Sequence, residues 1–260
     1  MIRYFGYVLS LLLVSQSLAG EPLEDFMSAT FRVAGKTHSG TGFLVAVKKE
    51  ETQPANRVAL VTAAHVFEQM PERADLMLRS EHAEKGFVRA ALSIPVRNGD
   101  KPLWVRHPTL DIAAVWVDLP ENVAAKPLSL DQLADEKSLL EKRIKVGQET
   151  WIPCFPAKLE ANEAAWPVLR RGTIATHPLV PVKYAKTMLI DFTTFGGDSG
   201  APVAVIQNDR PLVVGLVLAM HRQSDKATLP FEERTVHTPL GLSIVAQAVF
   251  IRETLDLLVK

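Results

Sequence analysis

The chain has 260 residues, 47% of them hydrophobic, which is enough for one large domain or two small ones around a sizeable core. Lys plus Arg and Asp plus Glu each number 29, so the formal net charge is zero. This balance gives no electrostatic basis for binding nucleic acid or an anionic membrane surface, and we expect neither as a partner.

The N-terminus has the layout of a secretory signal peptide. Arg3 is followed by an apolar run over residues 4–14 and then by small residues, which places the expected cleavage after Ala19 and the signal peptide at residues 1–19. The alternative is an N-terminal membrane anchor, but the run is short for a membrane span. We therefore expect an exported protein, either periplasmic or secreted, with no membrane contact beyond the export signal.

From residue 25 onward, short apolar runs alternate with Gly, Pro and polar clusters, which is typical of β-strands. The runs are TFRVAG, GTGFLVAV, RVALVT, DIAAVWV, ETWIPCF, KTMLIDF, APVAVI and LVVGLVLAM. So many closely spaced strands predict an all-β barrel or sandwich. Two segments have helical spacing instead, residues 130–143 and the C-terminal segment 241–260.

The order of these segments predicts two β-barrels. We place an N-terminal barrel at residues 25–118 and a C-terminal barrel at 149–240, joined by a charged, Pro-containing connection at 119–148. The helix at 241–260 would pack outside, and a shared cleft would lie between the barrels. Cys154 is the only cysteine, so no intramolecular disulfide can form. We expect it to be a small, buried hydrophobic residue.

Three short motifs carry the residue types needed for acyl transfer. VTAAHVF contains His65, HPTLDIAAVWV contains Asp111, and GGDSGAPV contains Ser199. A serine hydroxyl is too weakly acidic to attack alone, so an imidazole must take its proton and a carboxylate must orient the imidazole. Each motif alone is common in proteins, but the three together, in the order His, Asp, Ser, point specifically to acyl transfer.

Acyl transfer also gives a chemical reason for the glycines of the third motif. A tetrahedral intermediate needs backbone N–H donors at close range, and we expect those donors on Gly197 and Ser199. An α/β-hydrolase elbow is excluded, because Ala201 occupies its last glycine position and the order of the three residues differs.

TAAH, DIAAV and GDSGAP resemble the motifs of trypsin-like serine peptidases of the chymotrypsin fold, and are most similar to compact bacterial members such as glutamyl endopeptidases and the HtrA protease domain. The resemblance spans about residues 27–220. It implies two six-stranded antiparallel barrels with the active site between them. It also implies Ser199 as nucleophile, His65 as general base and then acid, Asp111 as orienting carboxylate, and Gly197 with Ser199 as oxyanion hole.

The same resemblance implies a specificity pocket lined by Thr193, Thr194 and the strand residues Leu218, Ala219 and Met220. No acid stands at Thr193, the pocket base, so a preference for Arg or Lys is not supported. Val217 stands where glutamyl members carry His. We therefore predict cleavage after small or medium aliphatic residues.

In digestive members of this family the acid before the nucleophile pairs with an amino terminus freed by cleavage. Here the stretch Arg32 to Gly35 lies inside an expected strand, so activation there is not expected. Asp198 needs another partner: a side-chain cation, backbone donors, or the terminus left by signal cleavage.

The other six histidines lack metal-ligand spacing, so we expect no metal and no cofactor. Three functions stay open on the sequence. The first is an exported serine endopeptidase acting on polypeptides. The second is a binding or chaperone-like protein of the same fold with weak or no catalysis, and the third is an ester hydrolase. The oligomeric state is not indicated by any motif.

Overall fold

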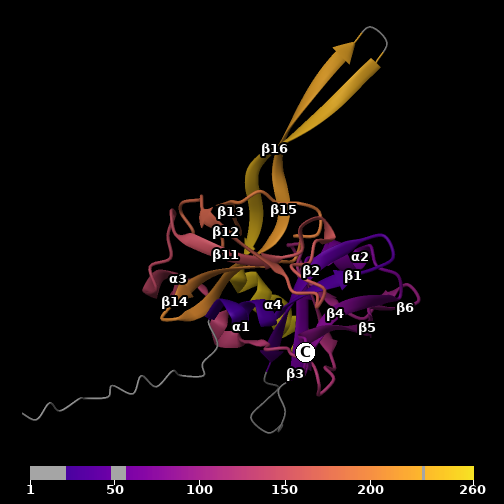
Figure 1. The fold of residues 1–260 in the computed structure, drawn as a ribbon. Helices are drawn as coiled ribbons and strands as arrows, with labels where there is room; N and C mark the ends of the chain where they lie inside the picture. The colour runs from indigo at the N-terminus through magenta and orange to yellow at the C-terminus, as the bar shows by residue number, and fades with distance from the viewer. Residues whose placement is uncertain (1–21, 48–56, 230–231) are drawn as a thin grey trace, which may run out of the picture.

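The computed structural model describes residues 22–47, 57–229 and 232–260 (Figure 1). The predicted signal peptide and its cleavage site lie outside these residues. The described chain consists mainly of β-strands in two units, followed by a C-terminal helix. Within the described ranges, no helix is both long and apolar enough to cross a membrane.

The N-terminal unit is a sheet of eight strands. Its order is β5-β4-β1-β2-β3-β9-β8, and β10 pairs with β2 in parallel. The strands are β1 (Thr30–Ala34), β2 (Ser39–Val47), β3 (Arg57–Thr62), β4 (Arg73–His82), β5 (Gly86–Pro95), β8 (Val105–Arg106), β9 (Ala113–Val117) and β10 (Leu128–Ser129). Two short helices, α1 (Pro22–Ser28) and α2 (Ala64–Glu68), and the small pair β6 (Arg97–Asn98) and β7 (Lys101–Pro102) complete the unit.

The C-terminal unit is a closed barrel of order β11-β12-β13-β16-β15-β14, antiparallel throughout. Its strands are β11 (Glu149–Cys154), β12 (Val168–Ile174), β13 (Thr187–Asp191), β14 (Pro202–Gln207), β15 (Arg210–Leu229) and β16 (Glu232–Gln247). The remaining elements are η1 (Leu130–Gln132), α3 (Glu136–Glu141), η2 (Pro156–Lys158) and the C-terminal α4 (Ala248–Val259). The predicted all-β class with a C-terminal helix is confirmed, and the structure consists of one closed six-stranded antiparallel barrel and an additional eight-stranded sheet.

The predicted helix boundaries are wrong in two places. Residues 241–247 belong to β16, where Ser243 pairs with Ile190 of β13 on one side and with Met220 of β15 on the other. This strand closes the barrel, and its long-range pairing overrides the helical spacing of its apolar residues. Within 130–143, only Glu136–Glu141 is α-helical, because Asp135 caps a helix that starts there.

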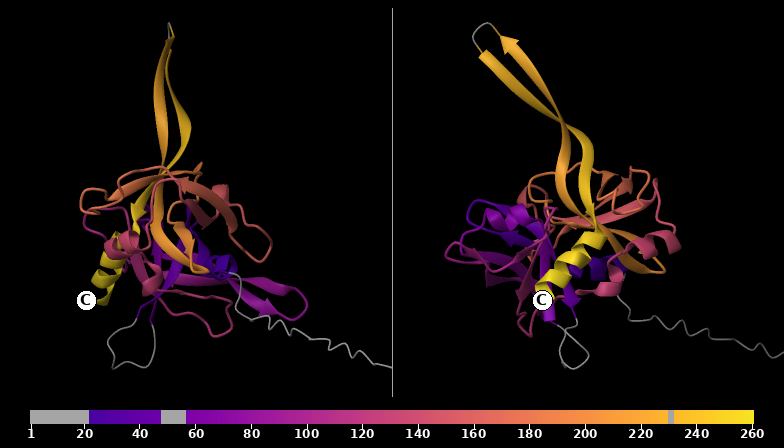
Figure 2. Two further views of the ribbon diagram at one scale, coloured as in Figure 1. Left: turned by 90° about the vertical axis from the view of Figure 1, so that its left-hand side faces the viewer. Right: turned by 180° about the vertical axis from the view of Figure 1, so that it is seen from behind.

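The ends of β15 and β16 form a feature that the sequence motifs did not predict. Their pairing continues beyond the barrel to Leu229 and Glu232, and the resulting two-stranded ribbon projects away from both units (Figures 1 and 2). Residues 221–228 and 232–240 of this ribbon are exposed. We call residues 221–229 and 232–241 the hairpin.

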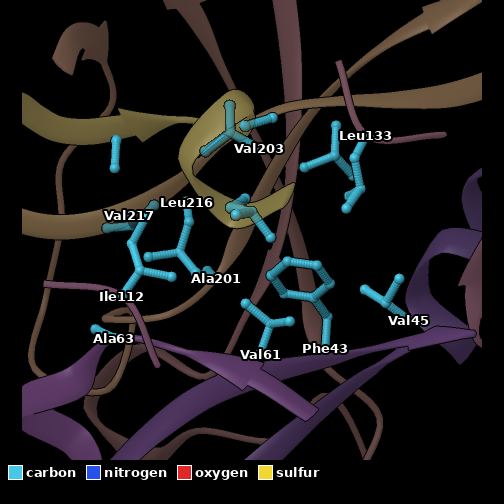
Figure 3. Close-up of a cluster of buried hydrophobic side chains, with 14 of the residues drawn as sticks. Phe43, Val45, Val61, Ala63, Ile112, Leu133, Ala201, Val203, Leu216 and Val217 are labelled. Atoms are coloured by element: carbon cyan, nitrogen blue, oxygen red, sulfur yellow. The ribbon is translucent and has the colours of Figure 1, made fainter. Parts of the chain in front are cut away.

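The two β units share one hydrophobic core (Figure 3). Phe43 and Val61 of the N-terminal sheet lie opposite Val203 and Leu216 of the barrel, and all four are fully buried. Leu133, from the connection between the units, packs into the same cluster. The units are therefore held in register by apolar packing, which fixes how their facing loops meet.

Arg79 on β4 also links the two units, through hydrogen bonds to the backbone of each. Its side chain is fully buried, and its guanidinium lies 4.4 Å from the ring centroid of Phe31 and 4.3 Å from that of Trp166. It donates to the carbonyl of Thr30 (3.2 Å) in the N-terminal sheet and to that of Ala165 (3.0 Å) between β11 and β12. One cation thus joins backbone from both units.

Replacing Arg79 with Met should lower the free energy of unfolding by about 3 kcal/mol, because buried carbonyls lose a charged donor while the apolar volume is largely kept. Urea unfolding followed by tryptophan fluorescence measures this. Arg89→Met is the control, because it removes a more exposed arginine that pairs with Glu160 and should cost less than about 1 kcal/mol. Equal losses for the two variants would contradict the role assigned to Arg79.

Candidate active site

His65 lies in α2, directly after β3, and faces Asp111 in the loop before β9. The ring Nδ1 of His65 lies 2.5 Å from Oδ2 of Asp111, and the backbone N–H of His65 donates to Oδ1 over 2.9 Å. The Ala64 N–H also donates to the Asp111 carbonyl, at 3.2 Å. Three contacts therefore fix the imidazole and the carboxylate relative to one another.

The charge state of Asp111 suits this pairing. Burial raises its pKa, but the hydrogen bonds and charge of His65, together with the charge of Arg106, outweigh burial and hold the pKa below its usual value. An ionised Asp111 accepts from Nδ1–H, so Nε2 of His65 is left as the basic nitrogen.

The loop that presents Asp111 is organised by His107 and α4. Nδ1 of His107 accepts from the N–H groups of Thr109 (3.2 Å) and Leu110 (3.1 Å), so its proton is on Nε2, which lies 3.0 Å from Glu253 of α4. The C-terminal helix therefore braces the loop on which the carboxylate sits.

Ser199 lies in the tight connection between β13 and β14 and shares a cleft with His65. The cleft has a volume of about 230 Å³ and is lined by His38, Ser39, His65, Val66, Gln69, Gly196, Gly197 and Ser199. The Ser199 hydroxyl donates to the carbonyl of Leu218 over 3.4 Å. Among the described residues, no hydrogen bond joins Ser199 Oγ to His65 Nε2. A larger hollow of about 740 Å³, beside α1 and Trp166, shares no lining residue with this cleft.

The backbone before Ser199 is fixed at the Gly196–Gly197 peptide, beside the cleft. The carbonyl of Gly196 accepts from the Ala157 N–H at 2.6 Å, and because the peptide is planar and trans, the N–H of Gly197 points the opposite way. Gly197 has φ +102°, and a Cβ there would lie 2.3 Å from the Phe155 carbonyl, so only glycine fits. In the described chain, the N–H groups of Gly197 and Ser199 have no protein acceptor.

Thr41 of β2 ties this loop to the N-terminal sheet. Its hydroxyl donates to the carbonyl of Gly197 (2.7 Å), and its N–H donates to the carbonyl of Ser199 (2.9 Å). Gly200 approaches so closely that a Cβ would lie 2.1 Å from the Thr41 carbonyl. Thr41 stands between the two glycines of the GTGF motif, but no local sequence pattern predicts this role for it.

Asp198 is fully buried and has a side-chain cation as its partner. Its Oδ2 accepts from Arg170 of β12 (3.1 Å) and from the Phe195 N–H (2.9 Å), while Oδ1 has no partner among the described residues. Burial raises the pKa of Asp198, and the Phe195 N–H and Arg170 only partly offset this effect. Of the three partners considered from sequence, the cation and the backbone donor are observed.

Arg170 braces both ends of the loop from Phe192 to Asp198. Besides binding Asp198, it donates to the Thr193 carbonyl at 2.7 Å. Its guanidinium also lies 4.1 Å from the centroid of the Phe192 ring and 5.3 Å from that of Phe195. Arg170 of β12 therefore fixes the conformation of the loop from Phe192 to Asp198.

The stretch from Arg32 to Gly35 is not a free arm. Arg32 lies inside β1, which pairs with both β2 and β4, and its side chain binds Glu160.

Cys154 is buried, as expected. Burial, reinforced by the charge of Asp198, raises the pKa of its thiol. A protonated, inaccessible thiol is not a nucleophile.

The residues expected to line a pocket come from neighbouring elements. Leu218, Ala219 and Met220 lie on β15, and Met220 pairs with Ser243 of β16. Thr194 is buried and shares a hydrogen bond with Ser243, whose hydroxyl also donates to the Phe192 carbonyl. The exposed Thr193 faces Gly241, since a Cβ on that glycine would lie 3.8 Å from its hydroxyl. No charged side chain stands among these described residues, and Ser243 was missed from sequence.

The comparisons with known proteins identify no family. No protein-family model matches the chain, and no curated protein matches it. Among solved structures, the chain is similar to Rv3671c from M. tuberculosis H37Rv, in the inactive form of a serine-to-alanine mutant. The two share 15% sequence identity over 93% of this chain and 92% of that chain, with a TM-score of 0.48.

Arg170→Met should destabilise the protein by about 3 kcal/mol at neutral pH, because Asp198 would stay buried without its counter-charge. Losing the cation raises the pKa of Asp198 further above its unfolded value, so the folded state takes up a proton more readily. The deficit should therefore shrink as pH falls and grow as pH rises through the folded pKa. Urea unfolding at pH 5 and pH 8 measures both effects.

Arg171→Met is the matched control for this variant. Arg171 is the next residue on β12, is 70% exposed and pairs with Glu149 at the surface. Its loss should change stability by no more than about 0.5 kcal/mol at either pH. A deficit for Arg170→Met that equals the control, or that does not vary with pH, would rule out a buried charge pair.

Proposed function

We propose that this protein is an exported serine endopeptidase that hydrolyses peptide bonds through Ser199, His65 and Asp111 by way of an acyl-enzyme. The observation that carries the proposal is the cleft lined by His65, Gly197 and Ser199, because the N–H groups of Gly197 and Ser199 have no acceptor within the described part of the chain. A His–Asp pair, a serine and convergent N–H donors are the parts that acyl transfer requires.

In the proposed reaction, the Ser199 hydroxyl first turns from the Leu218 carbonyl toward Nε2 of His65. Nε2 takes the hydroxyl proton as Oγ attacks the substrate carbonyl, and Asp111 stabilises the imidazolium that forms. The oxyanion accepts from the N–H groups of Gly197 and Ser199. His65 then protonates the leaving amine, and the acyl-enzyme is hydrolysed by water through the same groups.

The pocket residues support cleavage after small or medium aliphatic side chains. Thr194 and Ser243 satisfy each other's hydroxyl groups, and no charged group accompanies them, so a charged substrate side chain would be desolvated without a partner. Met220 narrows the entrance in this proposal.

A second function, a binding or chaperone-like protein with weak or no catalysis, is compatible with the position of the Ser199 hydroxyl. The Ser199 hydroxyl is bonded to Leu218 and not to His65. Catalytic hydrogen bonds are often long or misaligned before substrate binds, so this geometry fits both functions. Ester hydrolysis uses the same groups and is separated by comparing matched ester and amide substrates.

The exported location rests on the first nineteen residues. We propose cleavage after Ala19 and a periplasmic or secreted mature protein. N-terminal sequencing of the protein recovered from outside the cytoplasm tests this directly, and an intact Met1 would contradict it.

A fluorophosphonate probe should label the wild-type protein covalently, because it reacts with activated serines. Ser199→Ala should abolish labelling, and His65→Ala should slow it by about a hundredfold or more. Ser224→Ala, on the exposed hairpin, is the control and should label normally. Intact-protein mass spectrometry measures the adduct. A folded wild type that is not labelled would favour the binding function.

A peptide library should show cleavage after Ala, Val and similar residues, with little cleavage after Arg or Glu. Met220→Gly should shift the preference toward larger apolar residues by about tenfold in kcat/KM, because the side chain that narrows the pocket is removed. Strong wild-type cleavage after Arg or Glu would overturn the pocket assignment.

A further inference from the structure

Asp111 stands in the loop of residues 107–112, which joins β8 to β9. The backbone N–H of His107 closes the base of this loop by donating to the Ile112 carbonyl over 2.9 Å. On the other side of Asp111, the Leu110 N–H donates to the ring Nδ1 of His107 over 3.1 Å. Both chain neighbours of Asp111 are therefore bonded to the same residue.

The ring of His107 is fixed inside this loop. It is 4% exposed, and it packs edge-on against the ring of Phe250 in α4, with 5.4 Å between the centroids. Its Nδ1 also accepts from the Thr109 N–H over 3.2 Å. Because two backbone N–H groups point at Nδ1, that nitrogen has to stay unprotonated, and the ring proton belongs on Nε2.

Glu253 of α4 stabilises this position of the proton. Its Oε2 lies 3.0 Å from Nε2 of His107, and a carboxylate accepts hydrogen bonds without donating them. The helix that carries Glu253 is itself anchored, because Arg252 donates to the carbonyls of Leu130 (2.6 Å) and Leu133 (3.0 Å). Glu253 thus selects one tautomer of His107, as Asp111 selects the tautomer of His65, but with the opposite ring nitrogen.

We propose that His107 and Glu253 are positioning residues for the reaction. Glu253 selects the tautomer of His107 that accepts the two N–H groups, and His107 in turn holds Asp111 against His65. The inference rests on the proposed function, in which Asp111 stabilises the imidazolium. The other tautomer of His107 would turn an N–H group toward two N–H donors, and both bonds would be lost.

The expected consequence for catalysis follows from the precision that acyl transfer needs. A displacement of about 1 Å in a group that positions the reacting atoms can slow a reaction about a hundredfold. Asp111 acts on the charge that forms on His65 during the reaction, so its displacement lowers kcat and leaves KM largely unchanged. A loss of substrate binding alone would have the opposite pattern.

Two substitutions of His107 separate its acceptor from its bulk. His107→Leu keeps an apolar side chain but removes the acceptor, and kcat for a peptide that wild type cleaves should fall about tenfold or more. His107→Asn places an amide oxygen near the position of Nδ1, where it can accept the same N–H groups, and kcat should fall less than about twofold. His177→Leu, at an exposed histidine that also precedes a proline, is the control. Equal losses for the two His107 variants, or none, would overturn the role of His107.

The role of Glu253 is tested in two backgrounds. In an otherwise wild-type protein, Glu253→Ala should lower kcat about threefold to tenfold, because the second tautomer of His107 becomes accessible. In the His107→Asn background the same change should have no further effect, because an amide has no such tautomers. Asp256→Ala removes another exposed carboxylate of α4 and is the control. Additive losses in the double variant, or a normal kcat for Glu253→Ala, would overturn the tautomer role.

Proton NMR gives a readout that does not depend on catalysis. The proton between Nδ1 of His65 and Asp111 should give a downfield resonance in wild type, because this hydrogen bond is short and involves a carboxylate. His107→Leu should weaken or abolish the resonance, whereas His107→Asn should retain it. If His107→Leu does not fold, as judged by circular dichroism, the two Glu253→Ala comparisons decide.

These measurements separate the inference from the proposed function. A wild type that shows the resonance but is neither labelled by fluorophosphonate nor able to cleave peptides would refute the proposed function. The resonance in the His107 variants would then decide whether His107 holds Asp111. An active wild type whose folded His107→Leu variant keeps both the resonance and kcat would refute only the inference.

Discussion

A carboxylate with no exposed surface stands next to the proposed nucleophile, and the local structure depends on how its charge is balanced. Asp198 is held by Arg170 and by the Phe195 N–H, while its second oxygen has no partner among the described residues. Burial of a charge is costly unless it is paired, so Arg170 is needed wherever Asp198 is ionised. Because Arg170 also binds the Thr193 carbonyl, the same pair sets the path from the pocket to Ser199.

The loop conformation has a direct chemical consequence. Asp198 is buried and the Gly196 carbonyl accepts from the Ala157 N–H, so the N–H of Gly197, a residue that lines the cleft, points away from Ala157. Thr41 then fixes the loop against the N-terminal sheet, which carries His65 and Asp111. The contacts that join the two units are therefore the contacts that bring Ser199 to the imidazole. Arg79 and the shared apolar core support this arrangement from a distance.

Local patterns predicted much of this structure. Strands such as β2, β3 and β14 are short apolar runs between turn residues, as predicted. The motifs that contain His65, Asp111 and Ser199 lie near one another, since His65 contacts Asp111 and lines a cleft together with Ser199. Cys154 is buried, as its apolar neighbours indicated. These successes share a cause, since each depends on residue types within a few positions of one another.

The failures depend on long-range contacts. The apolar residues of 241–247 have helical spacing, but this segment pairs as a strand with β13 and β15, which lie far away in sequence. Thr41, Arg170 and Ser243 act through bonds to distant backbone or side chains, and no local pattern distinguishes them from ordinary strand residues. The hairpin was missed because its polar strands lack the apolar alternation that marks a half-buried strand.

That polarity also opposes pairing between copies along the exposed ribbon. Long free edges invite pairing between copies, and charged side chains on the edge oppose this. Arg222, Asp225, Lys226, Glu232, Glu233 and Arg234 supply such charges on both strands of the hairpin. Near Ser199 the edge is different, because Leu218, Ala219 and Met220 carry no charge. The part of β15 that is easiest to pair is therefore the part beside the cleft.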